Sequence, residues 1–372
     1  MKKIIVLGCG MVGRVIAADL AGDFDVTSVD ADRKSLDKLG DAAVKRVTAN
    51  LAGKGIVASL VRDFDLVIGA VPGFMGFATL RSVIEAGKNV VDISFFPEDA
   101  LDLDQAARAG GVTAVVDCGV APGMSNMILG HHAARMKVSH FKCYVGGLPF
   151  KRDFPFEYKA PFSPADVIEE YIRPARYVEN GHVVVRPALS DAEFLDFPEV
   201  GTLEAFNSDG LRSLLTTMQV PNMIEKTLRY PGHLDYVKVL RDSGFFGREE
   251  IPVGGRLLKP IEFTSAVLFK QWHLDDDDDE FTAMRIIVEG EADGRRRACR
   301  YNLFDRRDRA TGFSSMARTT GFPAAAAARL VLDGRLARKG VCPPEHIGAD
   351  GESFRFVMDY LRERNVHYRV DG

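Results

Sequence analysis

Three glycines near the start of the chain, Gly8, Gly10 and Gly13, follow the spacing G-x-G-x-x-G. Residues 3–7, which precede them, are mostly apolar, and apolar residues recur with helical spacing after them as far as Leu20. A strand, a tight turn and a helix in this order are typical of a unit that binds the pyrophosphate of a dinucleotide. The glycines permit the turn, the approach of the phosphates and the close packing of helix on strand. The phosphates would lie at the positive end of the helix.

An acidic residue stands where such a unit needs one. Residues 25–29 predict the second strand, which ends at Asp30, about twenty residues after the glycines. The carboxylate can accept hydrogen bonds from both ribose hydroxyls of NAD and would repel the 2′-phosphate of NADP, so the sequence favours NAD over NADP. Arg33 is a weaker signal for NADP, because its guanidinium could reach a 2′-phosphate. A similar domain with an empty crevice is the alternative.

Two further aspartates, Asp92 and Asp117, stand at the predicted carboxyl ends of later strands. Ligands bind at this edge of a parallel sheet, and two carboxylates that face one crevice could hold an ammonium group or accept protons from an amine. His233 follows a proline–glycine turn and titrates near neutrality, so it could transfer a proton. Arg229 could bind a substrate carboxylate with its forked guanidinium. The alternatives stay open, because aspartates often cap turns and histidines often lie in surface loops.

These side chains need a scaffold, and an alternation of strands and helices supplies one. Six strands alternate with helices up to residue 117, which predicts a complete α/β domain with a doubly wound parallel sheet, the Rossmann fold. Residues 66–70 predict a strand that is buried on both faces and ends at the edge where ligands bind. The residues expected to contact the cofactor lie in the glycine turn and at two strand ends: Gly8, Gly10, Met11, Val12, Gly13, Asp30, Val71 and Pro72.

The character of the sequence changes at residues 121–123, and Tyr, Phe, Pro and alternating apolar residues then dominate. This pattern predicts a second, α+β domain with a mixed sheet over residues 121–310. Its predicted elements are a helix at 163–171, strands at 183–185, 199–206, 226–230 and 259–263, and a hairpin of 284–289 and 296–303 that turns at Asp293-Gly294. Helices predicted at 315–333 and 353–363 are expected to fold back on the first domain, which would then combine residues 1–120 and 311–372.

Composition excludes several classes of protein. The 372 residues include 48 basic and 52 acidic ones, and a net charge of −4 gives no reason to expect nucleic acid or an anionic membrane as a partner. No apolar run has the ~18 residues of a membrane-spanning helix. Five scattered cysteines without a C-x-x-C pair indicate a reduced, cytoplasmic protein, and no residues have the spacing of a metal site. The acidic run 275–280 is expected to be a solvated loop.

Longer stretches of sequence carry a more specific signal. They begin at Val115 (VVDCGVAPGMSNMILG), Tyr144 (YVGGLPFKRDFPFEYKAPFS), Leu203 (LEAFNSDGLRSLL) and Thr227 (TLRYPGH), and MARTTGF and GVCPPEHI follow in the tail. With these stretches the chain resembles the saccharopine dehydrogenase-like oxidoreductases, most closely the lysine 6-dehydrogenase branch. The resemblance implies a two-domain enzyme whose second domain, residues 121–310, binds the substrate and forms a homodimer.

For the activity, the resemblance implies an NAD-dependent oxidation of the ε-amine of L-lysine to the semialdehyde. Asp92 and Asp117 would then lie near the amine, Arg229 and Asn207 would bind the α-carboxylate, and His233 would be a further acid–base group. The alternative within the family is a saccharopine dehydrogenase acting on a secondary amine. An alternative of another class is a non-catalytic NAD sensor, because the first seventy residues also resemble the nucleotide-sensing domain of potassium-uptake regulators.

Overall fold

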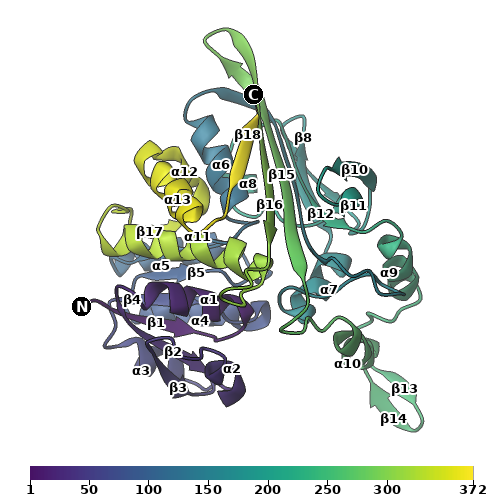
Figure 1. Cartoon of the computed structure of the whole chain (residues 1–372), viewed down its shortest axis with the longest axis horizontal. Helices are drawn as coiled ribbons and strands as arrows, with labels where there is room; N and C mark the ends of the chain where they lie inside the picture. The colour runs from purple at the N-terminus through teal and green to yellow at the C-terminus, as the bar shows by residue number, and fades with distance from the viewer. Residues whose placement is uncertain (372) are drawn as a thin grey trace.

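The computed structural model describes residues 1–371, which form two large β-sheets with helices packed against them (Figure 1). Within this range the first sheet has seven parallel strands, in the order β17 (Gly340–Cys342), β6 (Thr113–Val115), β5 (Val90–Asp92), β4 (Leu66–Gly69), β1 (Lys3–Leu7), β2 (Asp25–Asp30) and β3 (Val44–Thr48). The central strands β1 and β4 are apolar and almost completely buried, as expected where helices cover both faces of a parallel sheet. The strand order is that of a doubly wound fold, so the predicted fold class is confirmed.

The helices of this half connect the parallel strands, and the predicted alternation holds throughout. They are α1 (Met11–Leu20), α2 (Arg33–Asp37), α3 (Ile56–Val61), α4 (Gly73–Glu85), the 3₁₀ helix η1 (Ala100–Leu103) and α5 (Asp104–Ala109). Because the carboxyl ends of β1, β2, β4 and β6 lie at one edge, the loops that follow these strands meet there.

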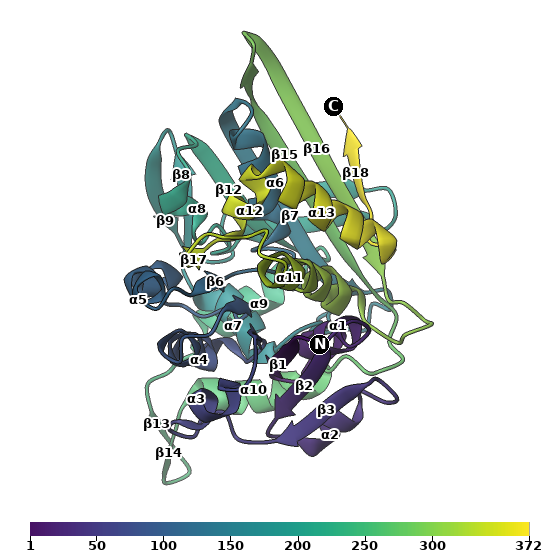
Figure 2. The same ribbon diagram turned by 90° about the vertical axis from the view of Figure 1, so that its left-hand side faces the viewer.

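The tail contributes to both sheets. Its helices are α11 (Ser315–Leu332), α12 (Pro344–Ala349) and α13 (Gly351–Glu363), and α11 packs against α1 (Figures 1 and 2). Strand β17 pairs with β6 in the first sheet, whereas β18 (Tyr368–Asp371) pairs with β16 in the second. The sequence had placed the whole tail with the first domain, and residue 372 lies outside the described residues. In residues 1–371 no helix is long and apolar enough to cross a membrane.

The second sheet is mixed, as predicted. Its main path in the described chain runs β10 (Glu193–Phe197), β11 (Gly201–Asn207), β12 (Asn222–Arg229), β7 (Lys137–Pro149), β15 (Glu280–Ala292), β16 (Arg295–Arg306) and β18, and β8 (Ala175–Glu179) and β9 (His182–Arg186) branch from β12. Strands β12 and β7 are parallel and the other neighbours on the path are antiparallel. The predicted hairpin is β15–β16, and Asp293 and Gly294 at its turn both have positive φ angles, 53° and 72°.

One predicted strand is wrong. Residues 259–263 form the start of α10 (Pro260–Gln271), in which Pro260 occupies the first turn and Thr264 and Leu268 face inward four residues apart. Five residues are too few to distinguish the two-residue repeat of a strand from the 3.6-residue repeat of a helix. The other helices of this half are α6 (Met124–Ala133), α7 (Pro164–Ile172), α8 (Leu214–Thr217) and α9 (His233–Asp242), and β13 (Ile251–Val253) and β14 (Arg256–Leu258) form a small hairpin.

Candidate active site

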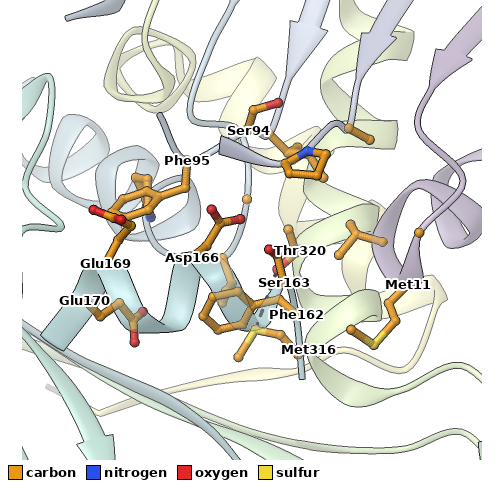
Figure 3. A pocket seen from close by; sticks show the side chains of 18 of the residues that line it. Met11, Ser94, Phe95, Phe162, Ser163, Asp166, Glu169, Glu170, Met316 and Thr320 are labelled. Atoms are coloured by element: carbon orange, nitrogen blue, oxygen red, sulfur yellow. Dashed lines mark hydrogen bonds between the residues drawn. The ribbon is translucent and has the colours of Figure 1, made fainter. Parts of the chain in front are cut away.

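A cavity of about 500 Å³ lies between the two sheets. Loops at the carboxyl edge of the first sheet form one side of it, and α7, β12 and the loop after β11 form the other. Figure 3 shows carboxylates of α7 around this cavity together with Met11 of α1 and Met316 of α11. The predicted ligand edge of the first sheet is therefore covered by the second half of the chain.

The glycine turn has the shape that a dinucleotide needs. A Cβ at Gly8 would overlap with the carbonyl oxygen of Ala70, and a Cβ at Gly13 would overlap with that of Gly8. A Cβ at Gly10 would meet nothing within 4 Å, so this residue leaves open space in front of the helix N-terminus. The predicted cofactor residues all line the cavity: Gly8, Gly10, Met11, Val12, Gly13, Asp30, Val71 and Pro72.

Asp30 lines the same cavity and is held in place by the backbone. Its Oδ2 accepts a hydrogen bond from the amide of Cys9 at 2.7 Å, and its Oδ1 accepts one from the amide of Asp32 at 2.9 Å. The side chain of Arg33 is 61% exposed and donates to Asp37 at 3.0 Å. The turn and the acid therefore fit the adenosine half of a dinucleotide, and Arg33 is turned toward another partner.

Besides Asp30, six carboxylates of the described chain line this cavity: Asp117, Asp166, Glu169, Glu170, Asp209 and Glu225. Asp166, Glu169 and Glu170 are three and four residues apart, so they share one face of α7 (Figure 3). Sequence reasoning predicted this helix but missed its role. The spacing of the three acids along the helix could have been noticed in the sequence. That they line a cavity depends on how α7 packs over the first sheet, which the sequence does not show. Such a wall suits a ligand that carries positive charge.

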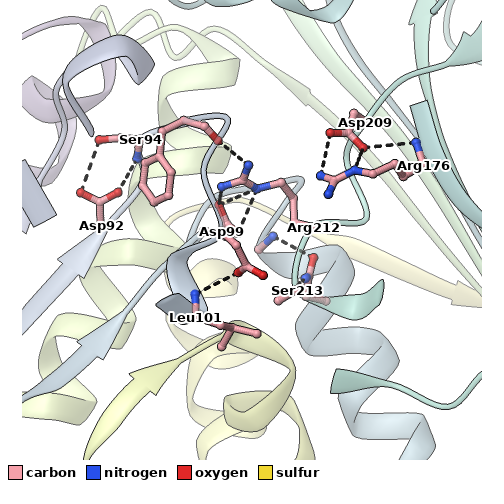
Figure 4. A network of polar contacts seen from close by, with 12 residues as sticks. Asp92, Ser94, Asp99, Leu101, Arg176, Asp209, Arg212 and Ser213 are labelled. Carbon is pink, nitrogen blue, oxygen red and sulfur yellow. Dashed lines mark hydrogen bonds and ion pairs between the residues drawn. The ribbon is translucent and has the colours of Figure 1, made fainter. Parts of the chain in front are cut away.

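The two predicted catalytic aspartates differ in their surroundings, and Figure 4 shows Asp92 beside Ser94. Asp92 is fully buried, accepts hydrogen bonds from the amide and hydroxyl of Ser94 at 2.8 and 3.3 Å, and lies outside the cavity wall. Burial raises the pKa of Asp92 to about 8. Asp117 lines the cavity and forms an ion pair at 3.1 Å with Arg212, which also donates to the carbonyl oxygen of Phe96. Asp92 thus caps the turn after its strand, the alternative raised from the sequence.

Arg229 lines the cavity, but each of its three nitrogens already has a partner. Nε donates to the Tyr171 hydroxyl at 2.9 Å, Nη1 to the carbonyl oxygen of Leu228 at 2.9 Å, and Nη2 to Glu170 at 2.8 Å. Arg173, which sequence reasoning did not single out, also lines the cavity and lies 4.9 Å from the ring centre of Phe95. Its buried Nη1 has no hydrogen-bond partner within residues 1–371.

His233 and Asn207 lie outside the cavity wall. The Nδ1 of His233 is 2.9 Å from the carbonyl oxygen of Phe156 and its Nε2 is 3.0 Å from the Tyr171 hydroxyl. Burial lowers the pKa of His233 to about 3, so the imidazole is neutral. Asn207 donates to Ser190 and Asp191. Of the predicted catalytic and substrate residues, the structure therefore brings Asp117 and Arg229 to the cavity and leaves Asp92, His233 and Asn207 behind its wall.

Comparison with known proteins places this geometry in a family. The model of the saccharopine dehydrogenase NADP binding domain matches residues 4–115, and that of the saccharopine dehydrogenase C-terminal domain matches residues 119–366. A saccharopine dehydrogenase (NADP+, L-glutamate-forming) from Pyricularia oryzae is 29% identical over 269 residues, which are 68% of this chain and 59% of that protein. The chain thus spans less than two thirds of this relative.

Other relatives match over nearly their full length. A carboxyaminopropylagmatine dehydrogenase from Synechocystis is 22% identical over 94% of both chains. The structure of apo saccharopine dehydrogenase (L-Glu forming) from Saccharomyces cerevisiae covers 100% of this chain and 99% of its own, with a TM-score of 0.78 and 20% identity, and shows the same fold. With both family models matched across the two halves, the chain belongs to the saccharopine dehydrogenase family.

Proposed function

We propose that this protein is an NAD-dependent oxidoreductase that acts on the C–N bond of an amino acid, and that its substrate is the ε-amine of L-lysine, which it oxidises to the semialdehyde. The observation that carries the proposal is a single cavity in which the dinucleotide turn with Asp30 adjoins six further carboxylates. NAD, when bound, accepts a hydride from the carbon that carries the nitrogen. The acids of the cavity wall hold the cationic amine and stabilise the iminium cation that hydride loss leaves.

The balance of charge in the wall supports lysine. Lysine carries two amines and one carboxylate, whereas saccharopine carries two amines, one of them secondary, and three carboxylates. Among the described residues that line the cavity, there are two arginines, Arg173 and Arg229, and six acids besides Asp30. Arg173 has a free donor for the single α-carboxylate, and Arg229 would first have to release Glu170 or Tyr171. Saccharopine remains the second candidate, because the names of several relatives specify it.

Asp30 supports NAD as the cofactor. The matched family model and the Pyricularia relative carry NADP in their names, so this chain would differ from them. The carboxylate of Asp30 lines the cavity and would repel a 2′-phosphate bound beside it, and Arg33 pairs with Asp37. A cytoplasmic homodimer is also proposed, from the resemblance and the free cysteines, and light scattering tests the oligomeric state.

The test is NADH formation with L-lysine and NAD, run beside saccharopine and with NADP in parallel. Turnover of lysine with NAD supports the proposal, and turnover of saccharopine alone moves the protein to the neighbouring activity. Asp117→Asn should lose turnover while NADH binding stays intact. Binding of NADH without turnover of either amine would indicate the non-catalytic sensor.

A further inference from the structure

Glu225 is one of the acids in the cavity wall, and it is buried. It lies on β12, opposite Cys143 of β7, and only 5% of the residue is exposed. Glu225, Thr227 and Arg229 alternate along the strand, and all three line the cavity. The backbone of Gly210 covers the carboxyl group so closely that a Cβ there would overlap with Oε1. The group is therefore held at the cavity with little freedom to move.

The carboxyl group of Glu225 is incompletely bonded. Its Oε2 is buried and has no hydrogen-bond partner among the residues that the structure describes. A buried, ionised carboxylate oxygen without a hydrogen-bond donor is destabilised, and a substrate N–H group would supply the missing donor. In contrast, Asp117 faces Arg212, and Glu170 faces Arg229. Among the acids that line the cavity in the described residues, Glu225 is thus the one with a buried carboxylate oxygen that lacks a hydrogen-bond partner.

The groups around Glu225 are mostly acids. Glu170 faces it from α7, Asp209 from the loop after β11 and Asp117 from the end of β6, and Cys143 of β7 lies opposite it in the sheet. Burial is the largest effect, and together with the three acids it raises the pKa of Glu225 to about 8. Both the protonated and the ionised form are then available near neutral pH, as an acid–base catalyst requires.

We propose that Glu225 exchanges the proton with the substrate nitrogen. This role rests on the proposed function. The ionised carboxylate takes one proton from the substrate ammonium, R–CH2–NH3+, and the neutral amine then loses a hydride from carbon to NAD and becomes an iminium ion. Water adds to the iminium carbon, the nitrogen is protonated again and the C–N bond breaks. The sum is R–CH2–NH3+ + NAD+ + H2O → R–CHO + NADH + NH4+ + H+.

The test compares Glu225→Gln with wild type in the pH dependence of kcat for lysine oxidation. In wild type, kcat should rise with pH through a limb near pH 8, because the ionised form of Glu225 is the one that accepts the proton. Glu225→Gln should lower kcat ~10²- to 10⁴-fold and lose this limb, with the Kd for NADH unchanged. Glu280→Gln is the matched control. Glu280 is another buried acid with a raised pKa, about 7, but it lies outside the cavity wall, so the limb should remain and kcat should stay within about threefold.

A second measurement does not depend on turnover. The infrared band of protonated carboxyl groups should decrease between pH 6 and pH 10 in wild type, and the decrease should be smaller in Glu225→Gln, in which the buried Asp92 still titrates near pH 8. If Glu225→Gln does not fold, Glu225→Asp retains a carboxyl group and should keep the limb at lower kcat. A limb that survives in folded Glu225→Gln would refute the role of Glu225 and leave the proposed function standing. Wild type that oxidises no amine would instead overturn the proposed function, and the role of Glu225 with it.

Discussion

Replacing Asp30 with asparagine should remove most of the preference for NAD over NADP. The side chain lines the cavity at the end of β2, and its two oxygens also accept hydrogen bonds from the backbone amides of Cys9 and Asp32. Asparagine keeps the size of the side chain and one acceptor oxygen, and it removes the charge. Any disturbance of the loop weakens both dinucleotides alike, because they share everything except the 2′-phosphate. The ratio of the two Kd values therefore isolates the effect of the charge.

The magnitude follows from Coulomb's law and hydrogen bonding. Asp30 is half-buried, so unit charges about 4 Å apart interact near the aqueous limit of ~1 kcal/mol, and a doubly charged phosphate doubles this to about 2 kcal/mol. Replacing charge-assisted hydrogen bonds to the ribose by neutral ones adds about 1–2 kcal/mol. A total of about 3–4 kcal/mol corresponds to a change of roughly 150- to 900-fold in the ratio.

The assay is fluorescence titration with NADH and NADPH, which requires no substrate. Asp32→Asn is the control, because Asp32 loses the same charge two residues away but caps α2 and lies outside the cavity wall. Its ratio should change less than about threefold, since exposed charges at such distances are screened. A wild-type protein that binds NADPH as tightly as NADH, or an unchanged ratio in Asp30→Asn, would refute the assignment of Asp30.

Three further predictions concern stability. Gly13→Ala should lower the free energy of unfolding, measured by urea titration, by ~1–3 kcal/mol and weaken NADH binding, because the added Cβ would overlap with the carbonyl oxygen of Gly8. Gly22→Ala is the control and should leave the free energy of unfolding unchanged, because its Cβ would meet nothing within 4 Å. Arg212→Met leaves the buried Asp117 without its ion-pair partner and should lower the free energy of unfolding by about 3–5 kcal/mol. A decrease below about 1 kcal/mol would contradict the burial of this ion pair. The pKa of His233 is about 3 in the folded protein and ~6.5 in the unfolded chain, because the buried site favours the neutral imidazole. The contribution of His233 to the free energy of unfolding is therefore complete above pH 6.5 and is lost as the pH falls toward 3. His233→Gln should flatten the stability profile in this window.

The part of the site that depends on local sequence could be predicted. The glycine turn and the acid after the second strand belong to one strand–helix–strand unit, and the eight residues expected at the cofactor do line the cavity. The short strand β17 was missed because three residues carry no period, and β18 was missed because its partner lies about seventy residues earlier. His233 follows a proline–glycine turn, which suggested a surface loop, yet it packs among Tyr158, Tyr171 and Trp272.

The part that depends on register between distant strands could not be predicted. On β12, Glu225 faces the cavity, whereas the next residue, Lys226, donates to Glu193 at 2.6 Å and lies outside the cavity wall. Successive residues of a strand point to opposite faces, so a slip of one residue against β7 would turn the ammonium group of Lys226 inward in place of the Glu225 carboxyl group. The sign of the charge that the cavity offers an amine therefore depends on a pairing between residues about eighty positions apart. Neither stretch of sequence contains this information by itself, and the acids of α7 acquire their meaning in the same way, from the sheet on which the helix packs.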